Sequence, residues 1–338
     1  MRAIISGVGH YVPDKILSNN DLEKMVDTND EWITTRTGIK ERRILDKEKG
    51  SSYMATKAAQ LILEETNTSP EELDLILFAT VTPDMPVPSA VSFVQRKLGA
   101  TNSWGYDING GCTGFMCALT TGAQFIESGR HKKVLVIGAD KMSAITNYED
   151  RTTCVLFGDA AGAVLLEPCD RDDLGIKDFI LHLDGTGAES LMIAGGGSVH
   201  PTSQETLDKK MHYIWQDGKT VFKHAVVGMA DVSVKIVERN NLVDNDIRFF
   251  IPHQANFRII DAAAKKMGLN PDRVVVNINK YGNTTAATIP LAMSEIYRAN
   301  KLHKGDWIIL AAFGAGFTWG SVLLRWALDS SAEPVRRL

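Results

Sequence analysis

The strongest local signal in the sequence is the stretch Asp107-Ile108-Asn109-Gly110-Gly111-Cys112-Thr113-Gly114-Phe115. A buried strand predicted over 105–109 ends here, two glycines permit a sharp turn, and a helix predicted over 113–128 begins directly after Cys112. A strand that enters a helix in this way is typical of α/β folds. The turn places the Cys112 thiol at the positive end of the helix dipole, near free backbone amides that favour a thiolate. Cys112 is therefore a candidate nucleophile; the alternative is a small buried residue in a tight turn.

Short β-branched runs alternate with longer helical patterns along the rest of the chain, which predicts buried strands in an α/β fold. The other strand patterns occupy 4–9, 73–80, 134–139, 163–167, 249–251, 274–279, 307–312 and 321–326. The other helical patterns lie near 52–66, 88–98, 220–239, 257–267 and 289–299. Residues 186–217 show no sustained period, and such a long aperiodic stretch is either a functional flap or a disordered loop.

The strand patterns fall into two similar sets. A strand at 107–109 passes through a glycine turn into a helix, and 277–279 does the same through Gly282. Short apolar strands produce such echoes by chance, so the pattern alone leaves internal duplication open. A real duplication predicts two packed halves whose strand ends meet at one central site. We place the boundaries at 1–170 for the first half, 171–217 for a connecting or flap segment, 218–328 for the second half and 329–338 for a fraying tail.

Composition and charge argue against several classes of function. The 338 residues carry a net charge of −4, which gives no global basic field for nucleic acid or an anionic membrane surface. Four cysteines without a C-x-x-C pair indicate free thiols in a reducing compartment. The longest apolar stretch, 307–317, is too short for a bilayer, and the N-terminus lacks a signal-peptide pattern, so we expect a cytoplasmic protein. Eight scattered histidines without metal-ligand spacing predict no metal site.

Three further positions can take part in chemistry with Cys112. His253 follows a hydrophobic strand end, where α/β sheets present site residues, although a capping or core histidine is the alternative. Asn283 occupies in the second set the place that Cys112 holds in the first, but asparagine after glycine is often only a turn residue. The glycine-rich run 313–317 follows a long strand and is either a close approach to substrate or an ordinary hairpin.

These motifs occur in the order and spacing of a known enzyme family. The chain resembles β-ketoacyl-[acyl-carrier-protein] synthase III from about residue 2 to residue 328. The resemblance is carried by the turn around Cys112 and by 31–33, 36–39, 252–256, 282–284 and 313–320. It implies an α/β, thiolase-like fold, in which two duplicated halves stack in a five-layer arrangement. It also implies an acyltransferase that forms a homodimer.

The resemblance further implies a reaction in two steps. Cys112 takes an acyl group from acyl-coenzyme A, and the backbone amides of Cys112, Ala315 and Gly316 hold the oxyanion. Malonyl-acyl-carrier protein then loses carbon dioxide, and its enolate oxygen accepts hydrogen bonds from His253 and Asn283. The enolate carbon attacks the acyl group to give a β-ketoacyl product, which initiates type II fatty-acid synthesis. No metal or cofactor is required beyond the coenzyme A thioester that serves as substrate.

Three peripheral sets of residues follow from the same resemblance. Coenzyme A would bind at Trp32, Arg36, Arg151 and Asn256, although Trp32 by itself reads as a core tryptophan. The acidic carrier protein would dock on Lys223, Arg258, Lys265 and Lys266, where a plain charge run is usually a solvated helix face. The acyl pocket would be shaped by Val87, Met142, Leu156 and Phe157. Of these, Val87 is expected to come from the partner subunit.

One departure from the family pattern leaves the primer open. The family commonly carries alanines where this chain has Gly110-Gly111, and the loss of two methyl groups can widen the site. Ala315 in the glycine turn is a milder difference. A ketosynthase III-like enzyme of specialised metabolism, with another acyl chain or acceptor, is the nearest alternative. More distant ones are a papain-like hydrolase, which shares the order Cys, His, Asn, and a scaffold that has lost its chemistry.

Overall fold

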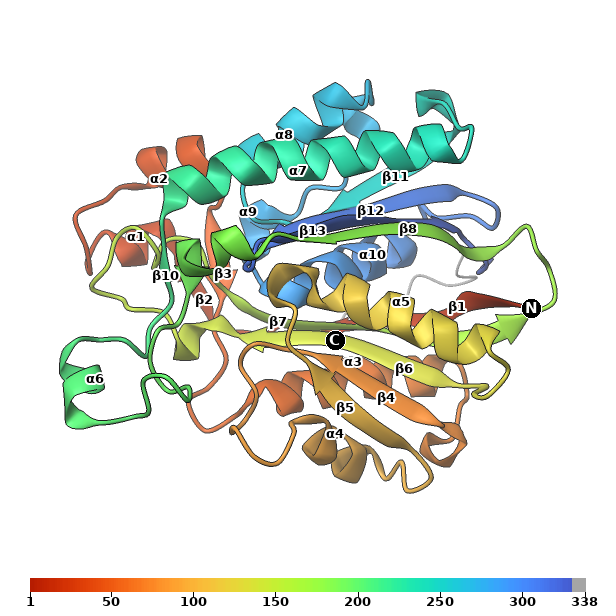
Figure 1. Ribbon diagram of the computed structural model, residues 1–338, viewed down its shortest axis with the longest axis horizontal. Coiled ribbons are helices and arrows are strands. Elements are labelled where there is room, and N and C mark those ends of the chain that lie inside the picture. Colours follow the sequence, from red (N-terminus) through yellow and green to blue (C-terminus); the bar gives the residue numbers. More distant parts are fainter. Residues whose placement is uncertain (330–338) are drawn as a thin grey trace.

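The computed structural model describes residues 1–329, and two β-sheets form its framework (Figure 1). In spatial order, the first sheet contains β1 (Arg2–Tyr11), β7 (Asp159–Cys169), β6 (Val134–Lys141), β4 (Leu75–Ala79) and β5 (Trp104–Ile108). The second contains β11 (Ile247–Pro252), β12 (Trp307–Gly314), β13 (Thr318–Arg325) and β8 (Gly175–Leu183). Strands β4 and β6 are apolar and buried along nearly their whole length, because helices cover both faces of their sheet.

Helices separate and cover the two sheets, which gives five layers (Figure 1). The central layer consists of α5 (Gly114–Glu127) and α10 (Thr288–Arg298). The outer face of the first sheet packs on α3 (Ser51–Glu65) and α4 (Val91–Leu98), and that of the second on α7 (Gly218–Arg239) and α8 (Phe257–Lys266). Within residues 1–329, no helix is long and apolar enough to cross a bilayer.

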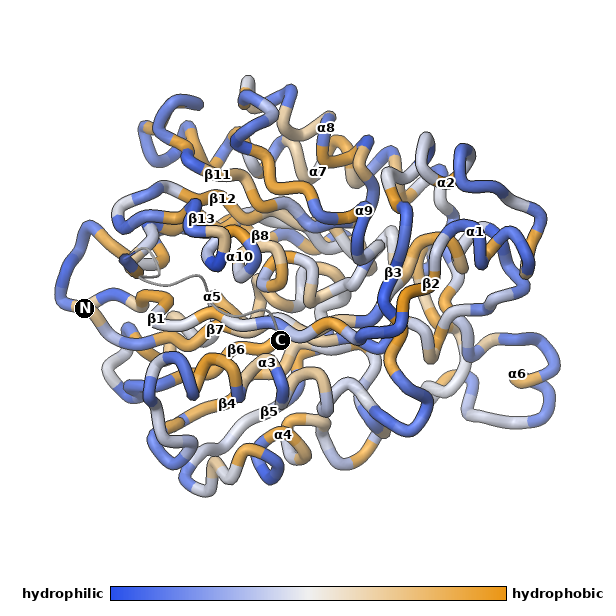
Figure 2. The backbone as a smooth tube through the Cα atoms, turned by 180° about the vertical axis from the view of Figure 1, so that it is seen from behind, coloured by the Kyte–Doolittle hydropathy of each residue, from blue (hydrophilic) through white to orange (hydrophobic). Residues whose placement is uncertain are grey.

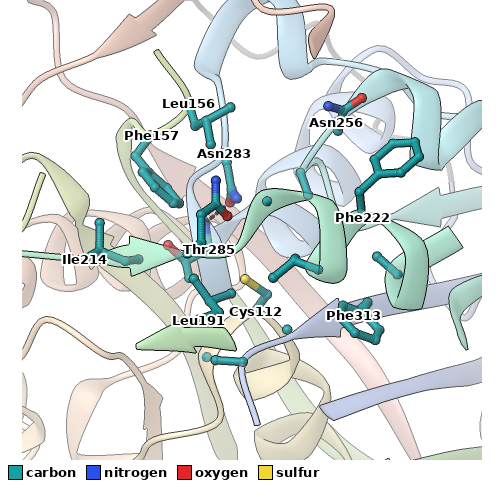
Figure 3. A pocket seen from close by; sticks show the side chains of 18 of the residues that line it. Cys112, Leu156, Phe157, Leu191, Ile214, Phe222, Asn256, Asn283, Thr285 and Phe313 are labelled. Atoms are coloured by element: carbon teal, nitrogen blue, oxygen red, sulfur yellow. Dashed lines mark hydrogen bonds between the residues drawn. The ribbon is translucent and has the colours of Figure 1, made fainter. Parts of the chain in front are cut away.

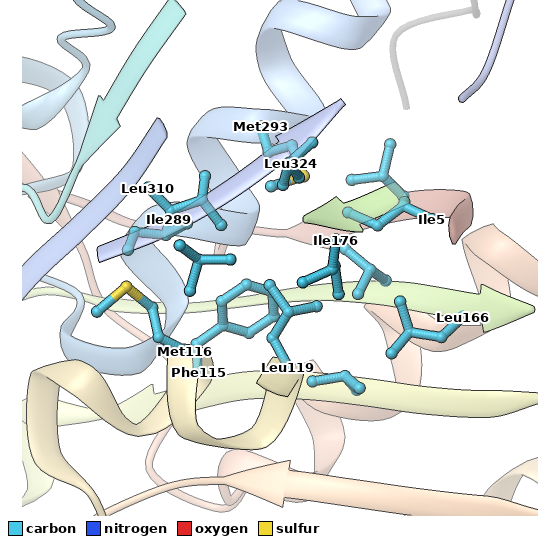
Figure 4. Packing of buried hydrophobic residues seen from close by; sticks show 14 of the residues in the cluster. Ile5, Phe115, Met116, Leu119, Leu166, Ile176, Ile289, Met293, Leu310 and Leu324 are labelled. Carbon is cyan, nitrogen blue, oxygen red and sulfur yellow. The ribbon is translucent and has the colours of Figure 1, made fainter. Parts of the chain in front are cut away.

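The central helices join the two sheets through one hydrophobic cluster. Figure 4 shows Phe115 and Leu119 of α5 between Leu166 of the first sheet and Ile176 and Leu310 of the second. Apolar residues on both sides of α5 are buried, as expected for a helix between two sheets. Figure 2 shows the same division along the chain, with apolar strands inside and hydrophilic turns outside. The start of α5, which directly follows the turn that contains Cys112, is therefore fixed by both halves.

The sheets repeat one topology, which supports the duplication that the sequence left open. The order β8-β13-β12-β11 follows β1-β7-β6-β4, with two antiparallel pairs and then a parallel pair in each case. The position of β5 is taken in the second half by Val274, which forms one parallel bridge with Phe250. The two halves and five layers expected from the resemblance are present.

The strand predicted over 274–279 is wrong beyond that single bridge. The side-chain oxygen of Gln254 accepts hydrogen bonds from the backbone N–H groups of Asn277 (3.0 Å) and Ile278 (3.2 Å). These groups are therefore unavailable to a sheet, and the chain turns into α9 (Ile278–Tyr281). A side chain from a distant part of the sequence thus competes with the strand, which periodicity alone does not reveal.

The segment 171–217 contains more structure than a connection. Its first part forms β8, which pairs antiparallel with β13, so the second sheet begins before residue 218. The aperiodic stretch 186–217 contains α6 (Gln204–Asp208) and a short pair formed by β9 (Leu191–Met192) and β10 (Trp215–Gln216). Of the expected tail, residues 330–338 lie outside the described part of the chain.

The N-terminal region forms a small group of elements outside the five layers. It contains β2 (Ile16–Ser18), α1 (Asn19–Leu22), α2 (Asp30–Thr37) and β3 (Glu41–Arg43), none of which the sequence patterns indicated. The side chain of Arg42 is fully buried and donates to Asn19 and to the carbonyl of Val155 (2.8 Å). These hydrogen bonds connect the N-terminal group of elements with the loop that precedes Phe157.

We expect the buried His10 to make stability depend on pH. Its Nδ1 lies 2.8 Å from Ser294 Oγ in α10, and burial lowers the imidazole pKa from 6.5 to about 4. Between these values the unfolded chain binds a proton that the folded chain does not, so unfolding becomes easier as pH falls. His10 should contribute about 3 kcal/mol to this loss. Urea titrations between pH 7 and pH 4 should show a shallower loss for His10→Gln, and parallel curves would contradict it.

Candidate active site

A cavity of about 760 Å³ lies where the two halves meet. Its lining includes Cys112 from the first half and His253 and Asn283 from the second, which are the three residues expected to do chemistry. Figure 3 shows the Cys112 side chain in this cavity, with Asn283 and Thr285 on one side of it and Phe313 on another. The tertiary structure therefore brings together side chains that the sequence places far apart.

Cys112 occupies a tight turn between β5 and α5. Gly111 has φ +53°, a left-handed conformation that glycine adopts most readily, and it begins a short 3₁₀ turn that contains Cys112. The hairpin between β12 and β13 packs directly against this turn. A Cβ atom on Gly314 would lie 2.9 Å from the Cys112 nitrogen, so only glycine permits the approach. The hairpin expected at 313–317 is confirmed, and its turn contacts the nucleophile turn. A close approach to substrate stays a prediction.

The Cys112 thiol is protonated in the unliganded protein. Burial and the nearby Asp140 carboxyl raise its pKa to about 12, and the side chain is 8% exposed. The sequence predicts a stabilised thiolate from the helix N-terminus alone. The expected local effect is present, because a hydrogen bond from the backbone of Cys112 lowers the pKa of the thiol, but burial and Asp140 raise it by more.

His253 stands at the end of β11, as predicted. Its backbone N–H donates to the Ala311 carbonyl of β12 at 2.7 Å, and its ring is 2% exposed. Nδ1 lies 2.7 Å from Thr288 Oγ1, whereas Nε2 has no hydrogen-bond partner among residues 1–329. Burial lowers the imidazole pKa to about 3, so the ring is neutral. The capping or core alternative is not tested by this geometry, but the ring nitrogen without a partner among residues 1–329 supports a role at the cavity, which stays a prediction.

Asn283 is held by the first half of the chain. Its backbone N–H donates to the Leu156 carbonyl (2.8 Å), and its own carbonyl accepts from Gly158 (3.1 Å). Its side-chain Oδ1 accepts from the Thr285 N–H at 2.9 Å. This bond orients the amide so that the other end, the Nδ2 donor, remains free for a ligand.

The expected oxyanion donors are only partly placed at the cavity. Cys112 and Ala315 line it, whereas Gly316 is not among the lining residues. The hydroxyls of Thr113 and Thr318 lie 2.8 Å apart and join the nucleophile turn to the hairpin. Two amides that converge from separate turns can hold a developing oxyanion without reorganisation. Their role stays a prediction.

The cavity mouth contains most of the residues expected to bind coenzyme A. The guanidinium carbons of Arg36 and Arg151 lie 5.2 Å and 4.9 Å from the centre of the Trp32 ring. Asn256 donates from Nδ2 to the Arg36 carbonyl at 3.1 Å and caps α8. Trp32, Arg36 and Asn256 line the cavity, whereas Arg151 is not among the lining residues and pairs with Asp27. The indole is partly exposed at the cavity, with both guanidinium groups over its ring. Its stacking on coenzyme A stays a prediction.

Comparison with known proteins identifies the family. The family described as 3-oxoacyl-[acyl-carrier-protein (ACP)] synthase III matches residues 106–185, and its C-terminal counterpart matches residues 237–326. Beta-ketoacyl-[acyl-carrier-protein] synthase III of Chlorobaculum tepidum is 54% identical over 328 residues, which cover 96% of this chain and 100% of that protein. The chain belongs to the β-ketoacyl-[acyl-carrier-protein] synthase III family.

Solved structures agree with this family assignment. The 3-oxoacyl-[acyl-carrier-protein] synthase III of Aquifex aeolicus VF5 has a TM-score of 0.89 at 45% identity, covering 96% of this chain and 100% of that one. A priming β-ketosynthase from the R1128 polyketide biosynthetic pathway has a TM-score of 0.90 at 31% identity, covering 97% of each chain. The thiolase-like fold is confirmed, and the chain is an acyl-transferring condensing enzyme. The papain-like alternative is wrong.

The four basic residues expected to bind the acidic carrier protein differ in their ion pairs and in their position relative to the cavity. Lys265 pairs with Asp261 at 2.7 Å and Lys266 pairs with Asp231, which offsets much of their charge. The Arg258 guanidinium instead lies 5.3 Å from the centre of the Phe222 ring and lines the cavity mouth. The exposed Lys223 stands on α7 next to Phe222, but it borders a separate groove.

Only three of the four residues expected to shape the acyl pocket line the cavity. Met142, Leu156 and Phe157 line the cavity, whereas Val87 is 81% exposed and is not among the lining residues. Sequence reasoning missed several apolar lining residues of the segment 186–217. These are Leu191, Met192, Ile193 and Ile214. Their apolar character was visible, but a segment without period gives no sign of which residues point inward.

Two buried groups behind the synthase site also escaped sequence reasoning. The Asp140 carboxylate accepts from Thr80 Oγ1 (3.0 Å) and from the backbone of Val81 (2.8 Å) and Ala286 (3.2 Å). It thus joins the first half to the turn that follows Asn283. Thr288 holds His253, as described above. A threonine in a helix and an aspartate at a strand end carry no local signal of such contacts.

Proposed function

We propose that the chain catalyses the decarboxylating condensation of an acyl-coenzyme A with malonyl-acyl-carrier protein, which initiates type II fatty-acid synthesis. The observation that carries the proposal is the convergence of Cys112, His253 and Asn283 on one cavity. All three side chains are buried. Thr288 contacts His253 Nδ1 and the Thr285 N–H donates to Asn283 Oδ1, which leaves His253 Nε2 and Asn283 Nδ2 for substrate.

In the first step Cys112 is acylated. Its sulfur loses a proton and attacks the carbonyl carbon of the acyl-coenzyme A, and the bond from that carbon to the coenzyme A sulfur breaks. The coenzyme A thiolate takes up a proton in turn, so the exchange of one thioester for another is balanced. The N-terminus of α5 and the amides of Cys112 and Ala315 stabilise the charge that develops.

In the second step the malonyl group loses carbon dioxide. The carbon–carbon bond to its carboxylate breaks, and the electron pair forms an enolate whose oxygen accepts from His253 Nε2–H and Asn283 Nδ2. The enolate carbon bonds to the acyl carbonyl carbon, and Cys112 leaves as a thiolate that regains a proton. Both steps use groups of the protein and of its two thioester substrates. That the enzyme needs no cofactor stays a prediction.

The partners follow from the surface around the site. Trp32 and Arg36 would receive coenzyme A, and Arg258 with Lys223 would receive the acidic carrier protein, a pairing that salt should weaken. A homodimer is supported by the exposed Val87 and by β5, whose outer edge pairs with no strand within residues 1–329. A second subunit would supply Val87 to the acyl pocket. A cytoplasmic location stays a prediction.

Priming of a specialised pathway is the second candidate function. It rests on the likeness to a priming β-ketosynthase of polyketide biosynthesis, whose TM-score of 0.90 is as high as those of the synthase III structures. The same residues would act, and only the acyl chain or acceptor would differ. Of the two glycines before Cys112 only Gly111 lines the cavity, because Gly110 faces the backbone of Gly114, where a Cβ atom would lie 2.8 Å from the Gly114 Cα. The structure thus gives no general widening of the site, and the acyl chain has to be measured.

The proposal is tested by intact-protein mass spectrometry after incubation with acetyl, branched and longer acyl-coenzyme A thioesters. We expect a mass increase of one acyl group per chain with at least one donor. A short straight or branched adduct would favour fatty-acid initiation, and a long or unusual one would favour specialised metabolism. If neither a coenzyme A nor a carrier-protein thioester labels the protein, the proposal is wrong and a scaffold without chemistry remains.

A further inference from the structure

The turn that carries Asn283 also holds His253, through the hydroxyl of Thr288. Thr288 begins α10 and is 2% exposed, and its Oγ1 lies 2.7 Å from His253 Nδ1. The same oxygen lies 3.1 Å from the Thr285 carbonyl. A threonine hydroxyl has one proton to donate, so it can serve only one of these two acceptors.

The choice of acceptor decides which ring nitrogen of the neutral His253 carries a proton. If Thr288 donates to Nδ1, that nitrogen keeps its lone pair and the ring proton lies on Nε2. If Thr288 donates to the Thr285 carbonyl, Nδ1 must be protonated and Nε2 becomes an acceptor. The contact to Nδ1 is shorter, and an imidazole nitrogen is a more basic acceptor than a peptide carbonyl. Both facts favour the proton on Nε2.

Nε2 is also the atom left for substrate. Thr288 holds the opposite edge of the ring, and Nε2 is buried with no partner in the part of the chain that the structure describes. We propose that Thr288 is a positioning residue that donates its hydroxyl proton to His253 Nδ1 and thereby presents Nε2–H to the enolate oxygen. Its kinetic consequence rests on the proposed function, but the tautomer itself can be measured without substrate.

The same turn orients the second donor. The Thr285 N–H binds Asn283 Oδ1, and the Thr285 backbone has φ +53°, which is rare for a β-branched residue. Asp140 holds the next residue of this turn, Ala286, through its backbone N–H. Backbone strain of this kind persists where the surroundings fix it and is common at functional sites. Residues 283–288 therefore set the proton of His253 and the amide of Asn283 together.

Nuclear magnetic resonance of protein with ¹⁵N-labelled histidine tests the tautomer directly. The chain has eight histidines, and the signals of His253 are those lost in His253→Ala. In the wild type near neutral pH we expect Nε2 to be protonated and Nδ1 to be unprotonated. Thr288→Val keeps the shape of the side chain without its hydroxyl, and we expect it to give a mixture of tautomers or the reverse one. Thr288→Ser should keep the wild-type form.

The two half-reactions separate a positioning role from a structural one. We expect Thr288→Val to lower carbon dioxide release from malonyl-carrier protein at least about 10-fold, with acylation of Cys112 within about twofold of the wild type. Loss of an entire donor costs about 10²–10³-fold. Thr284→Val is the matched control, because Thr284 is fully buried in the same turn and its Oγ1 has no partner among residues 1–329. It should leave both half-reactions near wild-type rates.

Each outcome decides the proposal. A wild-type His253 protonated on Nδ1 would overturn it, as would Thr288→Val with an unchanged tautomer and unchanged carbon dioxide release. Equal losses in both half-reactions, without rescue by Thr288→Ser, would assign Thr288 a purely structural role and also overturn it. A wild type that never releases carbon dioxide would instead refute the proposed function, while the measured tautomer would still decide the role of Thr288.

Discussion

Cys112→Ala is expected to abolish the acyl-enzyme and to lower condensation by at least about 10⁴-fold, since a covalent nucleophile has no substitute in this cavity. The cavity lining contains one cysteine, so no second thiol in it can accept the acyl group. Intact-protein mass spectrometry should show no adduct with any thioester, and product formation should fall to background. Release of carbon dioxide from malonyl-carrier protein should persist, because His253 and Asn283 are unchanged.

Cys117→Ala provides the matched control for this prediction. Cys117 lies on α5, five residues beyond the nucleophile, and burial raises the pKa of its thiol. We expect normal acylation and condensation from this variant. An adduct that survives in Cys112→Ala and disappears in Cys117→Ala would show that the nucleophile has been misassigned.

His253→Ala and Asn283→Ala are each expected to slow carbon dioxide release by about 10²–10³-fold, the usual cost of one lost oxyanion donor. Acylation of Cys112 should be largely intact in both variants, because neither side chain belongs to the expected oxyanion site of the first step. Labelled malonyl-carrier protein measures the decarboxylation, and mass spectrometry of the same samples measures the acylation. The decisive result is a large loss of decarboxylation without a matching loss of acylation.

Two different results would contradict the roles assigned to His253 and Asn283. Normal condensation by His253→Ala would show that the assigned enolate role is wrong. A parallel loss of acylation in His253→Ala but not in Asn283→Ala would show that His253 removes the proton of Cys112. Thermal unfolding of each variant checks that a low rate does not come from a damaged fold, and Thr284→Val again serves as the control within the turn.

Local patterns were sufficient for much of the fold. The strands near 4–9, 73–80, 134–139 and 307–312 and the major helices follow from periods of two and 3.6 residues in the sequence. The position of Cys112 at a glycine turn before a helix was also predictable, because backbone conformation at glycine is a local property. The position of His253 at a strand end could be predicted for the same reason.

Other elements depended on partners distant in sequence. Strand β8 has a weak pattern of its own and is fixed by its pairing with β13. The strand expected at 274–279 gave way to hydrogen bonds from Gln254. The stability of such contacts depends on residues far apart in the sequence, so the local spacing of residues does not predict them.

Periodicity and glycine conformation were enough to predict the fold class and the turn of Cys112, and the resemblance to the synthase III family then singled out His253 and Asn283. How these three side chains behave depends on contacts that form only in the folded chain. The thiol of Cys112 stays protonated and the ring of His253 stays neutral because both halves bury them. Desolvation and hydrogen bonding sum over every element that surrounds a group, and they exist only once the chain has folded.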